Sequence, residues 1–220
     1  MPRITELTIQ KRGQRVDVYL DGLFSFVTSQ EFVAVRRLQV GSELSLDELQ
    51  QLREEELDQS VTDAVWQLLS YRARSREELR TRLRRKQYPA ASIERVLTRI
   101  SELGYLNDVE FAGSWVQMRQ ASSAPRGRAA LVHELRGKGV DGETVEAALV
   151  DLDEREAAFR AAAKRVRTLT RTEPREFRRR LGQFLQRRGF SFDVISEVLQ
   201  HYADAWDEEI PANTAQYEIE

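Results

Sequence analysis

Residues 75–100 read SREELRTRLRRKQYPAASIERVLTRI. Apolar residues recur in this segment at helical spacing, which predicts a helix, a tight turn and a second helix. The same register returns 52 residues later and again 50 residues after that. Its positions are Leu79, Leu83, Tyr88, Ile93, Val96, Leu97 and Ile100, then Leu131, Leu135, Val140, Val145, Ala148, Leu149 and Leu152, then Leu181, Leu185, Phe190, Ile195, Val198, Leu199 and Tyr202. All are apolar or small, so a supersecondary unit repeated three times is predicted.

Helix start signals divide each repeat into three helices. Ser75 opens a capping box, in which a hydroxyl and a carboxylate satisfy free amides of the first turn. We expect Ser92 to cap the third helix of the first repeat, and Asp108 to cap the first helix of the second. Pro174 is expected at the first position of a helix, and Ser191 is expected to cap the last helix.

The N-terminal region has the pattern of strands. Apolar and polar residues alternate in residues 4–10 and 15–20, and a third strand is expected at residues 24–27. Asp21-Gly22 tolerates positive φ and can close a hairpin between the second and third strands. A three-stranded meander is therefore predicted, followed by a short acidic helix at residues 46–56.

These patterns predict a mainly α fold, with three tandem three-helix repeats after a small β-rich module. The expected divisions are the N-terminal meander and acidic helix at 1–57, the repeats at 58–106, 107–152 and 153–206, and an acidic, disordered tail at 207–220.

Composition narrows the class of protein. The absence of cysteine removes disulfides, thiolate zinc sites and cysteine nucleophiles, and it fits a reducing compartment. No apolar run approaches the roughly 20 residues that a membrane span needs, and the N-terminus lacks a signal peptide's apolar segment. A cytoplasmic protein is the expectation.

Charge is segregated along the chain although the net charge is only -2. Residues 71–88 hold eight bases and two acids, and residues 160–188 hold eleven bases and two acids. Residues 41–58 and 204–220 are acidic. This distribution indicates a basic surface that faces nucleic acid or an acidic protein. A solvated helix surface explains the charge equally well, because arginine is a good helix former.

Catalytic patterns are missing from the sequence. It has no phosphate-binding loop followed by Lys-Ser or Lys-Thr, no nucleophile elbow and no zinc-binding helix. The two histidines are His133 and His201, and His133 does not share a helix face with its neighbour Glu134. No enzymatic activity, cofactor or metal is expected. The three tryptophans lie in apolar helical patterns and are expected in the core.

Basic residues recur in the repeat register. Arg76, Arg128 and Arg178 are equivalent, as are Lys86, Lys138 and Arg188, and Arg84 matches Arg136. The second set lies near helix C-termini, where the helix dipole alone favours cations, so structural and functional readings of it remain open. Arg76 and Arg128 lie near predicted helix starts, where the dipole disfavours cations, so a solvated helix surface explains them less well than a binding role does. Repeats stacked with constant rotation would align such positions in a basic stripe.

Four motifs in order carry a family resemblance. They are LSYRARSREEL at 69–79, GYLND at 104–108, ELRGKGV at 134–140 and LQRRGFS at 185–191, and together they resemble the RecX family of bacterial regulatory proteins. The resemblance spans about residues 60–206. It implies an elongated, curved array of three-helix repeats without enzymatic activity. It also implies binding in the groove of the RecA recombinase filament on DNA, which restrains recombination and the SOS response.

The expected partner is therefore the RecA filament, with direct contact to single- or double-stranded DNA as a further possibility and a monomer as the expected state. The alternative is a DNA-binding protein that uses the same basic face without RecA. The predicted contact residues are Arg72, Arg74, Arg76, Arg80, Arg84, Arg85, Lys86, Arg126, Arg128, Arg136, Lys138, Arg178, Arg179, Arg187 and Arg188.

Overall fold

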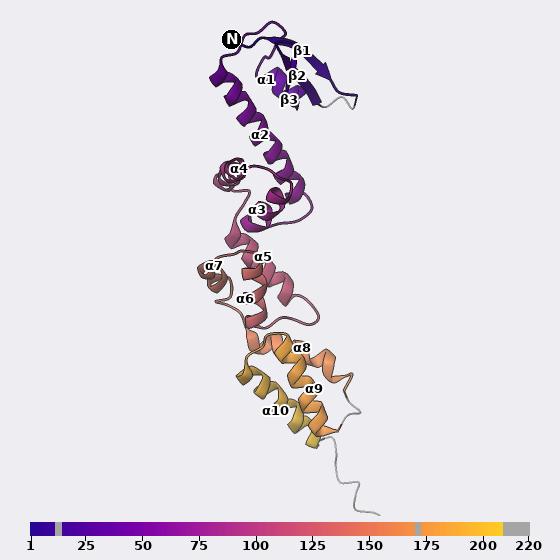
Figure 1. The fold of residues 1–220 in the computed structure, drawn as a ribbon. Coiled ribbons are helices and arrows are strands. Elements are labelled where there is room, and N and C mark those ends of the chain that lie inside the picture. Colours follow the sequence, from indigo (N-terminus) through magenta and orange to yellow (C-terminus); the bar gives the residue numbers. More distant parts are fainter. Residues whose placement is uncertain (12–14, 170–172, 209–220) are drawn as a thin grey trace, which may run out of the picture. The chain divides into compact units, whose positions relative to one another are not determined.

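The computed structural model describes residues 1–11, 15–169 and 173–208, with side chains described as far as Ala203 (Figure 1). The chain forms two compact units. The first contains Met1–Arg74 and Leu79–Leu106, and the second contains Ser75–Glu78 together with the chain from Asn107 onward. The predicted tail lies outside the described residues from 209 on, as do residues 12–14 and 170–172.

The first unit begins with the predicted meander. Its strands β1 (Ile4–Ile9), β2 (Arg15–Leu20) and β3 (Leu23–Ser29) form an antiparallel sheet in that order. Asp21 and Gly22 connect β2 to β3 with φ values of 50° and 83°, the conformation that the Asp-Gly pair favours. The short helix α1 (Gln30–Val35) follows.

A single long helix joins the sheet to the first repeat. The helix α2 runs from Leu46 to Leu69 and starts with a complete capping box at Ser45. The short acidic helix predicted at 46–56 is thus the beginning of a 24-residue helix, since no glycine or proline interrupts it. Leu52 of α2 packs into the core of the sheet, and Val61 packs into the core of the first repeat. The predicted border at residue 57 therefore falls inside α2.

The first repeat is completed by α3 (Arg76–Arg85) and α4 (Ala90–Glu102). Its buried side chains form one cluster, which includes residues of α2, α3 and α4. Within the first unit, a three-helix core therefore lies beside a separate sheet core.

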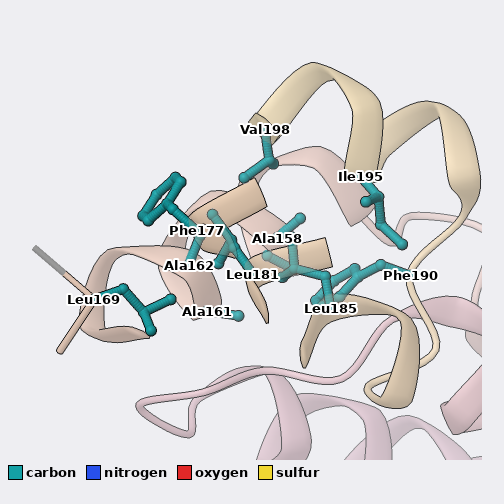
Figure 2. Close-up of a cluster of buried hydrophobic side chains, with 11 residues drawn as sticks. Ala158, Ala161, Ala162, Leu169, Phe177, Leu181, Leu185, Phe190, Ile195 and Val198 are labelled. Atoms are coloured by element: carbon teal, nitrogen blue, oxygen red, sulfur yellow. The ribbon is translucent and has the colours of Figure 1, made fainter. Parts of the chain in front are cut away.

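The second unit holds two further three-helix groups. One contains α5 (Asp108–Gln120), α6 (Arg128–Gly137) and α7 (Gly142–Ala148). The other contains α8 (Glu154–Val166), α9 (Pro174–Arg187) and α10 (Phe192–Glu208), and Figure 2 shows its buried cluster. Each group has its own cluster of buried residues.

The predicted register describes the three cores correctly. Every position of the seven-residue set is buried or half-buried in its own repeat. The second helix of each repeat also ends in the same way. Gln87, Gly139 and Gly189 are equivalent, and their φ values are 64°, 76° and 81°. The next amide in each case donates to the carbonyl five residues back at 3.2–3.3 Å, as in a Schellman motif.

Three local predictions were wrong. Ser92 lies inside α4, which begins after Pro89, because proline already supplies an extended residue at the helix start. Asn107 caps α5 in place of Asp108, since its side chain accepts from the amides of Val109 and Glu110. Trp66 is 39% exposed and meets the ring of Tyr105 edge to face at 4.9 Å, so it is not a core residue.

Among the described residues, no helix has the length and apolar character needed to span a membrane. Within the same part of the chain, no group of three or more His, Asp or Glu side chains could hold a metal ion.

Candidate partner-binding surface

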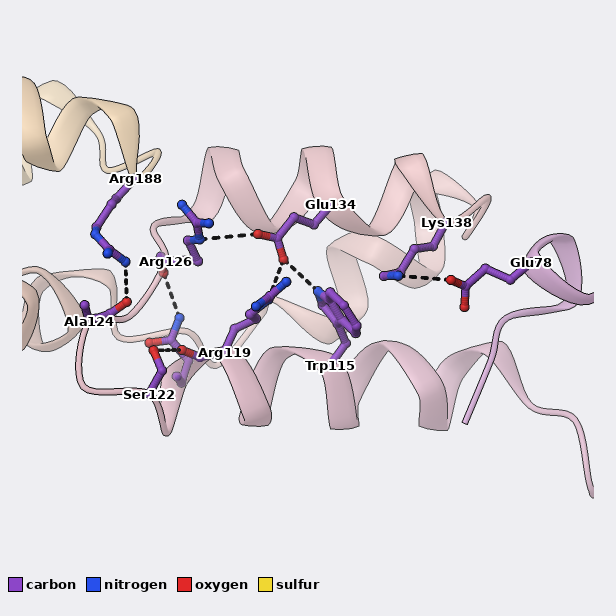
Figure 3. Close-up of polar contacts among 10 residues, drawn as sticks. Glu78, Trp115, Arg119, Ser122, Ala124, Arg126, Glu134, Lys138 and Arg188 are labelled. Carbon is purple, nitrogen blue, oxygen red and sulfur yellow. Dashed lines mark hydrogen bonds and ion pairs between the residues drawn. The ribbon is translucent and has the colours of Figure 1, made fainter. Parts of the chain in front are cut away.

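The first turn of α3 contacts the second repeat through one of the predicted cations, Lys138. The hydroxyl of Ser75 donates to the backbone carbonyl of Lys138 at 2.5 Å. The Lys138 ammonium lies 3.1 Å from a carboxylate oxygen of Glu78 and 4.0 Å from the centre of the Trp115 ring (Figure 3). With both charged side chains only 17% exposed, Lys138 contributes to the contact between repeats.

The junction between the second and third repeats uses equivalent positions. The amide of Gly127 donates to the carbonyl of Arg188 at 2.9 Å, and the amide of Ala129 donates to the carbonyl of Gly189 at 3.1 Å. The Arg188 guanidinium donates to the carbonyl of Ala124 (Figure 3). Two amides at the start of α6 are thus satisfied by carbonyls directly after the end of α9.

A carboxylate completes each junction. Asp108 accepts from the amide of Arg76 at 2.9 Å, and Glu154 accepts from the amide of Arg128 at 3.0 Å. Sequence reasoning missed these two acids. The available signal was an acid at the first position of the helix that opens the following repeat.

Arg76, Arg128 and Arg178 occupy equivalent positions in the three repeats, but their burial and contacts differ. Arg128 pairs with Glu146 and donates to the carbonyl of Leu149 at 3.1 Å. Arg76 is half-buried at the start of α3, whereas Arg178 is exposed one turn inside α9. The junction bonds of Arg76 and Arg128 are donated by their backbone amides, so substitutions other than proline leave these bonds possible. A substitution of Arg128 removes its side-chain contacts with Glu146 and Leu149 inside the second repeat.

Several other predicted cations are held within the protein. Arg80 forms a two-point contact with Glu94 at 2.5 and 2.9 Å. Arg74 is only 8% exposed, and its Nε donates to the carbonyl of Leu68 at 3.0 Å. Arg72 is exposed and donates to the carbonyl of Ala73 at 2.8 Å.

Glu134 is a hub that sequence reasoning did not identify. It accepts from the Trp115 indole at 2.9 Å and from Arg119 at 2.7 Å, and it lies 3.3 Å from the predicted contact residue Arg126 (Figure 3). Its side chain is 19% exposed. The neighbouring His133 is exposed.

The remaining predicted cations are exposed, and no other described residue pairs with their side chains. They are Arg84, Arg85, Lys86, Arg136, Arg178 and Arg187. Five of them lie at the C-terminal ends of α3, α6 and α9. The end of α3 is the densest group, because the exposed Arg82, which was not predicted, joins Arg84, Arg85 and Lys86 there. We call these four residues the α3 basic cluster.

Arg179 instead forms an ion pair with Glu176. This pair predicts how the stability at the start of α9 depends on pH. The hydrogen bond from Arg179, followed by that from Arg180, lowers the pKa of Glu176 from 4.5 to about 2. A lowered pKa means that the ion pair stabilises the start of α9 above about pH 4.5 and is lost as the pH falls towards 2. A carbon-detected NMR titration should give this low midpoint in the wild type. In an Arg179→Gln/Arg180→Gln variant the midpoint should rise towards 4.5, and an unchanged midpoint would contradict the assignment.

Four family profiles match the chain. They are described as the RecX N-terminal domain at residues 2–45 and the first, second and third three-helix domains of RecX at 62–99, 107–149 and 153–199. The matched residues make up well over half of the chain. They include the N-terminal region, which the four sequence motifs did not cover.

Relatives and solved structures agree with the profiles. The regulatory protein RecX of Bacillus subtilis is 31% identical over 95% of this chain and 80% of the relative, and that of Mycolicibacterium smegmatis is 38% identical over 64% and 81%. A crystal structure described as regulatory protein RecX superposes with a TM-score of 0.69 at 22% identity, covering 91% of this chain and all of the other. RecX from Lactobacillus salivarius superposes with a TM-score of 0.61 at 25% identity, covering 69% and 99%.

Proposed function

This chain belongs to the RecX family of regulatory proteins, and we propose that it regulates the RecA recombinase by binding along the RecA–DNA filament. Membership of this family confirms the sequence prediction that the chain is not an enzyme. The proposed effect is to limit filament extension, and thereby DNA-dependent ATP hydrolysis and strand exchange. Such a role places the protein in the cytoplasm.

The α3 basic cluster is the observation that carries this proposal. Its four side chains are exposed, and no described carboxylate neutralises them, so they can contact an acidic surface directly. Cations at the ends of α6 and α9 add further contacts of the same kind. Several weak contacts joined in one chain give an avidity that no single repeat provides.

Direct DNA binding is the second candidate, because the same cluster suits phosphate groups. A protein that neutralises several phosphates loses affinity steeply as salt rises. The two candidates therefore differ in their requirement for RecA. Direct binding predicts a strong, salt-sensitive complex with single-stranded DNA in its absence.

The test adds the protein to RecA assembled on single-stranded DNA. We expect stoichiometric amounts to reduce the ATPase rate and to shorten the filaments seen by electron microscopy. Unchanged ATPase activity and filament length would overturn the proposal.

Reversing charge in the α3 basic cluster tests the surface. The variant Arg84→Glu/Arg85→Glu/Lys86→Glu should bind filaments about 10- to 100-fold more weakly, since interface charge pairs contribute on the order of 1–3 kcal/mol in total. These side chains are exposed, but three acids at the C-terminal end of α3 oppose the helix dipole, so a stability loss of about 1–3 kcal/mol is also expected. Circular dichroism at the assay temperature checks that the variant remains folded. The matched control, Lys11→Glu/Arg37→Glu/Arg99→Glu, makes the same charge change at exposed residues outside both basic segments. Equal binding by both variants would place the contact elsewhere.

A further inference from the structure

A cationic cavity lies in the second unit where the second and third repeats meet. It has a volume of about 320 Å³, and its lining includes Ala161, Lys164, Arg165, Thr168, Phe184 and Arg188. We call it the basic pocket. Three of these residues are cations, and within the described chain no carboxylate lines the cavity.

The two arginines of the basic pocket have neutral hydrogen-bond acceptors, since Arg188 donates to the carbonyl of Ala124 and Arg165 donates to the hydroxyl of Thr168 at 3.4 Å. Arg165 and Arg188 lie against the ring of Phe184, with guanidinium carbons 5.9 and 4.8 Å from its centre. The Nε of Arg165 is buried, and no hydrogen-bond partner for it occurs among the described residues. Burial, and then the charge of Arg126, lower the pKa of Arg188. An anion in the pocket would relieve this unfavourable arrangement.

Helix ends explain part of the arrangement but not all of it. Both α8 and α9 end near the basic pocket, and cations in a last helical turn complement the helix dipole. The helix dipoles explain why cations line the basic pocket, but they do not explain why carboxylates are absent from its lining within the described chain. In a cavity of the first unit, by contrast, Arg36 pairs with Glu55 and Arg95 pairs with Asp58 at 2.9 Å.

The chemistry of the walls indicates a peptide ligand. The two guanidinium groups over Phe184 occupy the ring that a nucleic-acid base would need for stacking. Ala161 adds an apolar side chain to the lining. A peptide that carries an apolar side chain next to a carboxylate would match this lining of cations and apolar side chains.

The chain itself carries such a sequence. Residues 217–220 read YEIE, in which apolar and acidic residues alternate, and residues 204–220 contain six acids and no base. We propose that the basic pocket is a binding site for acidic, apolar peptide segments and that residues 217–220 of this chain occupy it. The tail then acts as an internal competitor for anionic partners of the third repeat.

The tether is long enough for this contact. The eight residues 209–216 span up to about 27 Å when extended. The helix α10 begins four residues after Arg188 and has 17 residues, so it is about 26 Å long. Since α10 packs against both α8 and α9, the last residues can reach the pocket from the end of α10. The contact uses a nearly extended tether, so its occupancy depends on the charge attraction between the acidic tail and the basic pocket.

The experiment uses the full chain, which has no native cysteine and can be labelled at one position. A nitroxide attached to an Ala215→Cys variant should broaden the amide NMR signals of Lys164, Thr168 and Arg188. The variant Glu218→Gln/Glu220→Gln changes only residues beyond the folded helices, and it should remove most of this broadening. Broadening that survives neutralisation of the tail would overturn the proposal.

A second pair of variants tests the pocket. In the labelled protein, Lys164→Glu/Arg165→Glu should abolish the broadening at Thr168 and Arg188, whereas the control Arg136→Glu/Arg178→Glu should retain it. Broadening spread equally over exposed cations would show non-specific attraction and would contradict the assignment. If an added single-stranded oligonucleotide shifts the pocket amides while the tail never broadens them, the pocket is a phosphate site and the proposal fails.

Discussion

Replacing Gly189 by alanine is expected to lower the free energy of unfolding of the second unit by about 2–5 kcal/mol. Its φ of 81° is in the left-handed region, which costs an alanine roughly 1–2 kcal/mol. The added Cβ would also lie 2.3 Å from the amide nitrogen of Ala130, and relief of such overpacking costs typically about 1–3 kcal/mol more. Urea denaturation followed by circular dichroism measures the loss.

Gly104 provides the matched control for this substitution. Its φ is 79°, but no atom lies within 4 Å of the position that a Cβ would take. Alanine there should therefore cost only the backbone contribution, about 1–2 kcal/mol. If the two variants lose the same stability, the close approach between α9 and the start of α6 does not hold the junction together.

The repeated register explains why so much of the fold could be predicted. The seven apolar positions of each repeat indicate which side chains its three helices bury, because apolar residues at helical spacing form the face of a helix that packs into the core. The residue with a left-handed φ after the second helix is a glycine in two repeats, Gly139 and Gly189, so the sequence already indicated the end of the helix there. In the first repeat Gln87 takes the same conformation, so composition alone would not have identified it.

The junctions could not be predicted, because they join residues far apart in the sequence. An acid opens the first helix of the following repeat, but this local signal does not say that Glu154 accepts from the amide of Arg128, 26 residues earlier. The continuity of α2 was missed for a related reason. The apolar positions of α2 change from facing the sheet core to facing the core of the first repeat, and this change resembles a boundary in the sequence.

The basic surface shows the limit of reasoning from charge. Arg80, Arg128 and Lys138 resemble Arg84 and Arg85 in the sequence, yet the first three are paired with acids. Only the structure separates cations that stabilise the fold from cations left exposed. The candidate site is consequently smaller than the predicted one, and it is concentrated at the C-terminal ends of the second helices.

Truncating Leu181 to alanine should remove about 2–5 kcal/mol of stability, because its side chain is fully buried in the cluster of the third repeat (Figure 2). In a tandem array, each repeat contacts mainly its neighbours, so such a loss should be local. Hydrogen exchange followed by mass spectrometry should show weakened protection in α8, α9 and α10. Protection of β1, β2 and β3 should be unchanged, because the sheet has its own core.

An exposed leucine provides the comparison for Leu181. Leu103 is 60% exposed, and its replacement by alanine should change stability by no more than about 0.5 kcal/mol. Equal loss of protection in the sheet and in the third repeat of the Leu181→Ala variant would show that the chain unfolds as one cooperative body. Loss confined to α8–α10 would instead mean that the third repeat can open while the α3 basic cluster remains in place. The third repeat could then leave a bound partner separately from the first.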